Sequence, residues 1–128
     1  MNVTVLSIVE TAYRATLEEQ DDTVLWLHHS LKTAGANVQL VLKGNAVNYA
    51  VNAQDASGLA FGDERQTQPP RLAEDLERLI AAGVKVHLVK EDLQALGLDA
   101  AELVDGVEHV SRADLAALIA SYDRVWYW

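Results

Sequence analysis

Short apolar runs alternate with longer amphipathic segments along this chain, and that alternation most constrains its fold. Residues 3–9 (VTVLSIV), 38–42 and 84–89 are rich in β-branched residues and have the length of strands buried on both faces. A brief run at 107–110 and the final YDRVWYW complete five candidate strands. Strands separated by helices pair in parallel through right-handed crossovers. We therefore predict one three-layer α/β/α domain over residues 1–128, with a mainly parallel sheet of about five strands and flavodoxin-like topology.

The segments between these runs carry helix signals at their ends. Asp22 is a candidate N-cap for a helix that ends near Gly35, with Val24, Leu27 and Leu31 on its inward face. Further helices are expected over 46–51 after Asn45, from the prolines at 69–70 to Gly83, over 92–96, near 99–102 and after Ser111. The polar connection at 52–67 is long enough to act as a lid or an oligomer contact.

Composition excludes several classes of function. The chain of 128 residues has no cysteine, so it forms no disulfide and carries no thiolate metal site or sulfur nucleophile. Its net charge of −9 repels phosphate backbones, and we expect no nucleic-acid partner. The apolar runs are of strand length and no secretory signal pattern opens the sequence. We therefore expect no membrane segment and a cytoplasmic location.

Polar side chains follow the predicted strands, at the edge where parallel sheets bind ligands. A helix start at Asn45 favours an anion through its free N–H groups, assisted by Lys43. Arg14 and Lys90 would supply positive charge, and Glu10 or Tyr49 would orient the ligand. The complete candidate binding site is Glu10, Arg14, Asn45, Asn48, Tyr49, Lys90 and Glu91.

Each of these signals also has a purely structural interpretation. Asn45 fits a simple helix cap, and Glu10 and Arg14 are spaced to pair with one another on a helix. Lys90 and Glu91 fit a solvated turn.

Cofactor and metal sites lack their usual patterns. No glycine follows the first strand, as a dinucleotide site or a P-loop requires. His28 and His29 are adjacent on a helix and point about 100° apart, which prevents easy chelation by both. We expect neither a cofactor nor a metal.

The stretch LKTAGANVQLVLKGNAVNYAV resembles the DsrE/DsrF-like family, in which a helix ending in Ala-Gly precedes an apolar strand and a Gly-[Asp/Asn]-Ala-Val helix start. The resemblance continues through PPRLAEDLERLIAAGVKVHLV, ALGL and LVDGVEHVSRADLAALIASYDRVWYW, from about Asp22 onward. It implies a small α/β protein that assembles into trimers or hexamers. The sulfur-handling members carry a cysteine at the end of the third strand. That place falls between Leu88 and Lys90, nearest Val89, so the resemblance implies a member without sulfurtransferase activity.

We therefore expect a non-catalytic, oligomeric, DsrE-like protein that binds a small polar or anionic ligand, or a protein partner, at the strand ends. A second hypothesis is an enzyme without cysteine, with Glu10 as a base and Lys90 as an electrostatic stabiliser; it requires a buried Glu10. A third is a purely structural oligomer whose strand-end turns pack closed. The terminal VWYW fits either burial in the core or an intersubunit contact.

Overall fold

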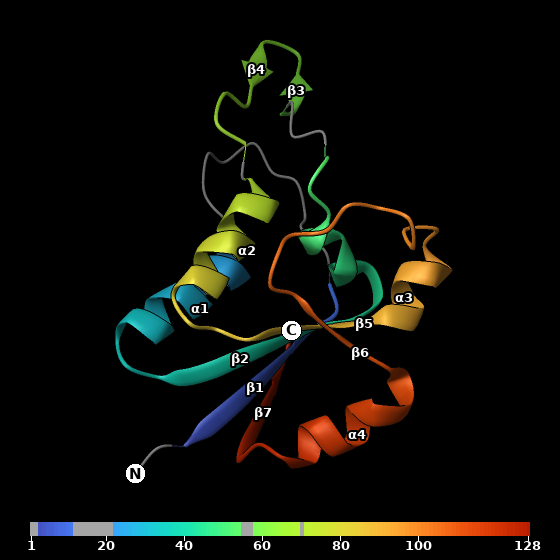
Figure 1. Ribbon diagram of the computed structural model, residues 1–128. Coiled ribbons are helices and arrows are strands. Elements are labelled where there is room, and N and C mark those ends of the chain that lie inside the picture. Colours follow the sequence, from blue (N-terminus) through green and yellow to red (C-terminus); the bar gives the residue numbers. More distant parts are fainter. Residues whose placement is uncertain (1–2, 12–21, 55–57, 70) are drawn as a thin grey trace.

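A five-stranded sheet, in which all neighbouring strands run parallel, forms the centre of the molecule (Figure 1). The computed structural model describes residues 3–11, 22–54, 58–69 and 71–128. The sheet contains β1 (Thr4–Val9), β2 (Asn37–Leu42), β5 (Val86–Val89), β6 (Glu108–Val110) and β7 (Arg124–Tyr127). The predicted α/β class and mainly parallel five-stranded sheet are confirmed.

The strand order across this sheet is β6-β5-β2-β1-β7. Counted along the chain this is 4-3-2-1-5, which differs from the 2-1-3-4-5 order of flavodoxin. The chain steps outward from β1 to β6 and then returns to place β7 on the other side of β1. Because the last crossover runs in the opposite direction, its helix lies on the opposite face. In Figure 1, α1 (Thr23–Thr33) and α2 (Leu72–Ala81) cover one face, and α4 (Arg112–Ala120) lies on the other.

The main core lies on the face that carries α1, α2 and the 3-10 helix η1 (Gly44–Ala50). Its largest member is Tyr49, followed by fully buried leucines from the helices and strands: Leu25, Leu40, Leu42, Leu76, Leu79 and Leu88. A smaller cluster on the opposite face is formed by Leu6, Val41 and Val89, against which α4 packs partly buried side chains. One face of the sheet is therefore much better covered than the other.

Helix α1 begins as predicted, but its fully buried residues are not the predicted ones. The Asp22 carboxylate accepts hydrogen bonds from the backbone N–H groups of Val24 and Leu25, and the helix ends before Gly35 at φ +97°. The fully buried residues of α1 are Leu25 and His28. Of the predicted inward face, Val24 is partly buried against the main core, whereas Leu27 and Leu31 are only half-buried. The hydropathy pattern missed the fully buried residues because one of them, His28, is polar.

Two connections differ from the prediction. The polar segment at 52–67 contains a small hairpin, β3 (Ala60–Phe61) and β4 (Glu64–Arg65), which projects away from the body in Figure 1. No helix forms at 99–102. That segment instead bonds to the end of η1: Val104 N–H donates to the Ala50 carbonyl, and Asn52 N–H donates to the Glu102 carbonyl. Pairing across the fold overrides the local capping pattern there.

The short helix α3 (Lys90–Ala95) follows β5 directly, two residues earlier than predicted. In the part of the chain that the structure describes, no helix is long and apolar enough to cross a membrane.

Candidate functional site

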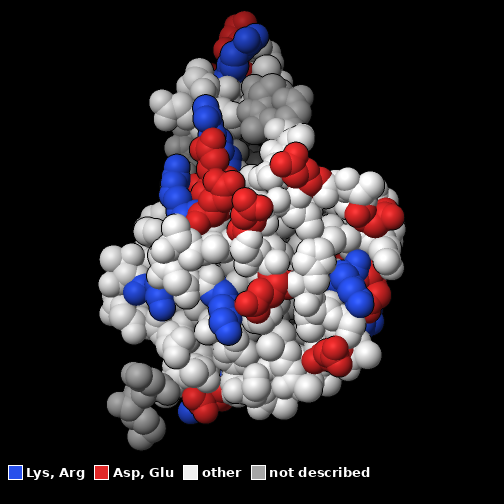
Figure 2. Space-filling view, viewed as in Figure 1, with Lys and Arg blue, Asp and Glu red and all other residues white. Residues whose placement is uncertain are grey.

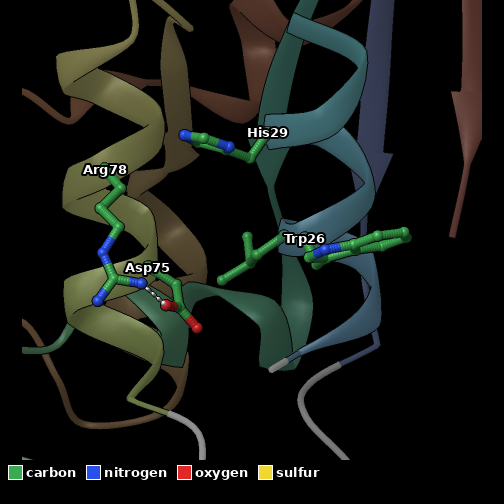
Figure 3. A pocket seen from close by; sticks show the side chains of 5 residues that line it. Trp26, His29, Asp75 and Arg78 are labelled. Carbon is green, nitrogen blue, oxygen red and sulfur yellow. Dashed lines mark hydrogen bonds and ion pairs between the residues drawn. The ribbon is translucent and has the colours of Figure 1, made fainter. Parts of the chain in front are cut away.

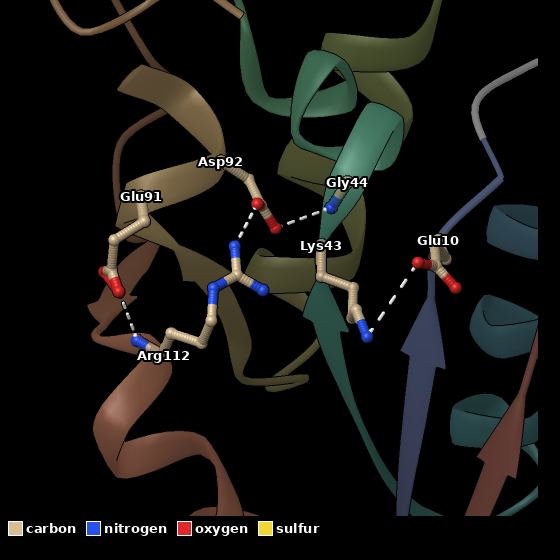
Figure 4. Close-up of polar contacts among 6 residues, drawn as sticks. All are labelled: Glu10, Lys43, Gly44, Glu91, Asp92 and Arg112. Atoms are coloured by element: carbon tan, nitrogen blue, oxygen red, sulfur yellow. Dashed lines mark hydrogen bonds and ion pairs between the residues drawn. The ribbon is translucent and has the colours of Figure 1, made fainter. Parts of the chain in front are cut away.

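Four neighbouring strands deliver charged side chains to one edge of the sheet. Glu10 follows β1 and Lys43 follows β2, while Asp92 lies in α3 directly after β5 and Arg112 opens α4 after β6. Figure 4 shows these residues together with Glu91 and Gly44. Their meeting follows from the parallel sheet, because the carboxyl ends of parallel strands lie at the same edge.

Asp92 is the buried centre of this site, with only 9% of its surface exposed. One carboxylate oxygen, Oδ2, accepts a hydrogen bond from the Gly44 backbone N–H at 2.7 Å. The other, Oδ1, pairs with Nη2 of Arg112. The helix start at Gly44, where the sequence predicts an external anion, therefore already holds a carboxylate of the chain itself.

Arg112 is held at two points and still faces solvent. Its backbone N–H donates to Oε2 of Glu91 at 2.6 Å, and its guanidinium contacts Asp92. Its side chain is nevertheless 51% exposed. A guanidinium has five N–H donors in a rigid planar fork, so one bond from Nη2 to Asp92 leaves other donors for a ligand. Among the described residues, Oε1 of Glu91 is buried without a hydrogen-bond partner.

Lys43 is the second cation at this edge. Its Nζ lies 3.8 Å from Oε1 of Glu10 and 5.9 Å from the centre of the Tyr127 ring. The neighbouring turn requires glycine, because Gly44 has φ +56° and a Cβ there would lie 3.2 Å from Cγ of Glu10. The turn thus brings the ends of β1 and β2 close together, and Glu10 holds Lys43 at the site.

Asn45 and Asn48 lie beside the site but do not cap η1. The helix begins at Gly44 with Lys43 in the N-cap position, and the Lys43 side chain makes no capping hydrogen bond. Asn45 is exposed, and its backbone carbonyl accepts a hydrogen bond from Nδ2 of Asn48 at 2.9 Å. The predicted capping role of Asn45 is therefore wrong, because the Asp92 carboxylate receives the Gly44 N–H instead.

The remaining predicted site residues lie in different environments. Tyr49 is buried, and its hydroxyl donates to Oδ2 of Asp22 at 2.8 Å, so it supports the start of α1 and faces no ligand. Lys90 is exposed as the first residue of α3. Arg14 lies outside the described residues. Glu10 and Glu91 lie at the strand-end edge, in contact with Lys43 and Arg112 respectively.

Arg112 was not predicted from the sequence. It follows the three-residue strand β6 and sits in the first turn of α4, where an arginine looks like an ordinary surface residue. The one available signal was its position directly after the helix cap Ser111, at the carboxyl end of a predicted strand. Lys43 and Asp92 lie in the predicted turns, but no local pattern selected them from their neighbours.

A second candidate is a pocket of about 110 Å³ between α1 and α2 (Figure 3). It is lined by Leu25, Trp26, His29, Asp75 and Arg78. Its two charged residues contact each other, with Nη1 of Arg78 donating to Oδ1 of Asp75 at 2.9 Å. Figure 2 shows acidic and basic side chains lying side by side on the face that carries α2. The strand-end site is the stronger candidate, because it gathers charged side chains from the ends of four neighbouring strands.

Two buried histidines have lowered pKa values. Burial is the main cause at His28, whose Nε2 lies 2.6 Å from Oγ of Ser7 and whose Nδ1 lies 2.7 Å from the Val24 carbonyl. Because a carbonyl only accepts, Nδ1 carries the proton of the neutral ring. Burial also lowers the pKa of His87, which lies 3.5 Å from Glu108. Among the described residues, no three His, Asp or Glu side chains gather as a metal site.

Comparison with known proteins identifies the relatives of this chain. The model of the DsrE/DsrF-like family matches residues 11–127. The structure of the ychN protein from E. coli is similar at a TM-score of 0.72 and 22% identity, covering 98% of this chain and 99% of that one. MTH1491 from Methanobacterium thermoautotrophicum, a protein of unknown function, gives a TM-score of 0.57 at 18% identity, with 98% and 99% covered.

BT1422 from Bacteroides thetaiotaomicron, a conserved protein of unknown function, gives a TM-score of 0.60 at 11% identity, with 97% of this chain and 94% of that one covered. No curated protein matches this sequence. At these identities the similar structures support the fold alone.

Proposed function

This chain belongs to the DsrE/DsrF-like family, and we propose that it acts as a non-catalytic, cytoplasmic, oligomeric member that binds a small anionic ligand at the carboxyl ends of its strands. The observation that carries this proposal is the placement of Arg112. Its guanidinium is oriented by the buried Asp92 and remains half exposed at the edge of the sheet. An arginine fixed in this way suits a carboxylate or another compact oxyanion.

The charges around Arg112 define the class of ligand. Lys43 adds a second cation, while Glu10, Glu91 and Asp92 surround the pair with negative charge. A polyanion would be repelled by these carboxylates and by the net charge of −9. A small molecule with one acidic group fits better.

Sulfur transfer and acid–base catalysis receive less support. The chain has no cysteine, and the strand end where the sulfur-carrying family members would place one is occupied by the buried Val89. Glu10, the candidate base, has a side chain that is 43% exposed and lies beside Lys43. The second hypothesis requires a buried Glu10, and the exposure of this side chain speaks against it.

An oligomer is supported by apolar side chains left on the surface. Val125, Trp126, Tyr127 and Trp128 are all exposed at one edge of the sheet. Contiguous apolar surface of this kind is typical of protein interfaces. We therefore propose a homo-oligomer, with a trimer or a hexamer as the assembly.

Native mass spectrometry of gently purified protein tests both parts of this proposal. The expected result is an oligomer that carries a reproducible small acidic adduct, which is absent from Arg112→Ala and present in Arg78→Ala. Arg78 is a matched control because it is an exposed, ion-paired arginine on α2. A monomer without an adduct would contradict the proposal.

A further inference from the structure

Strand β7 leaves one edge of the sheet open. Among the described residues it pairs only with β1, so its outer edge has no strand beside it. Natural edge strands are usually protected by lysine, proline or a bulge, or are covered by another element. Residues 125–128 are Val-Trp-Tyr-Trp and contain no charge and no proline. Apart from Arg124 at its start, this strand carries none of the sequence features that keep an edge from pairing further.

The side chains of this edge are exposed on both faces of the sheet. Trp126 lies opposite Ser7, on the α1 face, and is 37% exposed. Tyr127 points to the other face and is 59% exposed. Covering this exposed aromatic surface with a partner is favourable in free energy, because it removes apolar area from water.

The backbone hydrogen bonds show which groups of β7 point outward. Trp128 N–H donates to the Ile8 carbonyl at 2.9 Å, and the Trp128 carbonyl accepts from Glu10 N–H at 3.0 Å. Both polar groups of Trp128 are thus turned toward β1. In a parallel ladder this orientation alternates along the strand. The N–H and C=O groups of Val125 and Tyr127 therefore point away from β1, toward the open edge.

We infer that β7 is a two-fold contact at which it pairs antiparallel with β7 of a second copy, centred on Trp126. In this register Val125 of one copy lies opposite Tyr127 of the other, and both carry outward N–H and C=O groups. The two residues form a hydrogen-bonded pair twice, once on each side of the axis. Trp126 meets its own equivalent, and Arg124 lies opposite Trp128, where a guanidinium stacks on an indole ring.

Cross-strand side-chain pairs and charge also favour this arrangement. A β-branched residue opposite an aromatic residue, as in the Val125–Tyr127 pair, is a stabilising combination. The end of β7 that carries Trp128 lies beside Glu10, which bonds to it. An antiparallel partner brings its Arg124 to that end, so a cation of one copy approaches the exposed carboxylate of the other. The strand is thus complementary to itself in shape, hydrogen bonding and charge.

This inference rests on the proposed homo-oligomer and specifies its symmetry. A two-fold contact joins the two sheets into one of ten strands and requires an even number of subunits. Of the two proposed assemblies it therefore selects the hexamer and excludes a simple trimer.

Because the chain has no cysteine, a single introduced cysteine can be tested for disulfide cross-linking without competing thiols. In the inferred register Trp126 forms a non-hydrogen-bonded pair with itself, with a Cα separation of about 4.5 Å, within the disulfide range of about 4.4–6.8 Å. Trp126→Cys should form a covalent dimer on mild oxidation. Phe61→Cys, at the exposed hairpin, is the control and should not. No covalent dimer of Trp126→Cys would overturn the inference.

A proline variant tests the same contact without changing an aromatic residue. Val125→Pro removes an outward N–H, and proline is tolerated on an edge strand at such a position. We expect the native mass to fall by half, with the far-UV circular dichroism of the wild type. An unchanged mass would contradict the inference. Phosphate binding should persist in Val125→Pro, so failure here is distinguishable from failure of the Arg112 site.

Discussion

Asp92 and Gly44 are 48 residues apart in the sequence, yet a hydrogen bond of 2.7 Å joins the Asp92 carboxylate to the Gly44 backbone N–H. The same carboxylate contacts the guanidinium of Arg112. One buried side chain therefore fixes the start of η1 and positions the cation that we assign to ligand binding. The stability of the fold and the geometry of the site are coupled at this residue.

Replacing Asp92 should cost both stability and binding. Asp92→Ala leaves the Gly44 N–H without its acceptor and releases Arg112. A buried donor left unpaired costs about 1–3 kcal/mol, so the free energy of unfolding should fall by about that amount. Urea denaturation measures it. Asp92→Asn keeps one acceptor oxygen for Gly44 and should lose less; equal losses in both variants would argue against this role of the Gly44 bond.

Gly44→Ala should be more destabilising than Gly35→Ala. Both positions have positive φ, which costs an L-residue roughly 1–2 kcal/mol. A Cβ at Gly35 meets nothing within 4 Å, whereas one at Gly44 lies 3.2 Å from Cγ of Glu10. The additional cost at Gly44 should shrink when Glu10 is also replaced by alanine. Thermal unfolding of the two single variants and the double variant checks this, and strictly additive effects would refute the contact.

Tyr49→Phe should lower stability and leave ligand binding intact. The hydroxyl of Tyr49 is buried and donates to Asp22, the N-cap of α1. Loss of a hydrogen bond to a charged group costs about 1.5–3 kcal/mol. The variant is compared with the wild type by denaturant unfolding and by phosphate titration. A change in phosphate affinity larger than twofold would show that Tyr49 contributes to ligand binding.

Stability should fall as the pH is lowered below about 6.5. Burial lowers the pKa of His28 from its ordinary value of 6.5, so the unfolded chain takes up a proton that the folded chain excludes. The unfolded state then binds more protons, and stability decreases with falling pH by at most about 1.4 kcal/mol per pH unit for this residue. The lowered pKa of His87 acts in the same direction.

Urea denaturation at several pH values between 7 and 5 measures this slope. His28→Gln should reduce it. Identical slopes in the wild type and in His28→Gln would show that His28 takes no part in the acid response.

The elements of the fold were readable from the sequence because their signals are local. Apolar β-branched runs predicted the strands, and glycines at positive φ, such as Gly35 and Gly83, marked the ends of α1 and α2. The order of the strands was not readable, since it depends on which crossover reverses direction. The hydropathy pattern also did not predict which residues of α1 are fully buried, because they include the hydrogen-bonded His28.

The candidate site was only partly predictable for a similar reason. Glu10 and Glu91 were selected as candidates because they follow clear strands. Asp92 and Arg112 act as a pair, 20 residues apart, and only the folded sheet brings them together. Tyr49 was placed wrongly as a ligand contact because a short helix after a strand does not reveal which of its faces turns into the core.

The central claim, that Arg112 binds an anion, is tested most directly by titrating the wild type, Arg112→Ala and Arg78→Ala with inorganic phosphate and with acetate. Chemical shifts in two-dimensional NMR spectra report affinity and location together. The account predicts saturable shifts at the ends of β2 and β6, an affinity at least about tenfold weaker in Arg112→Ala (about 1.4 kcal/mol), and no change in Arg78→Ala. Equal affinity in all three proteins, or no saturable binding in the wild type, would contradict it.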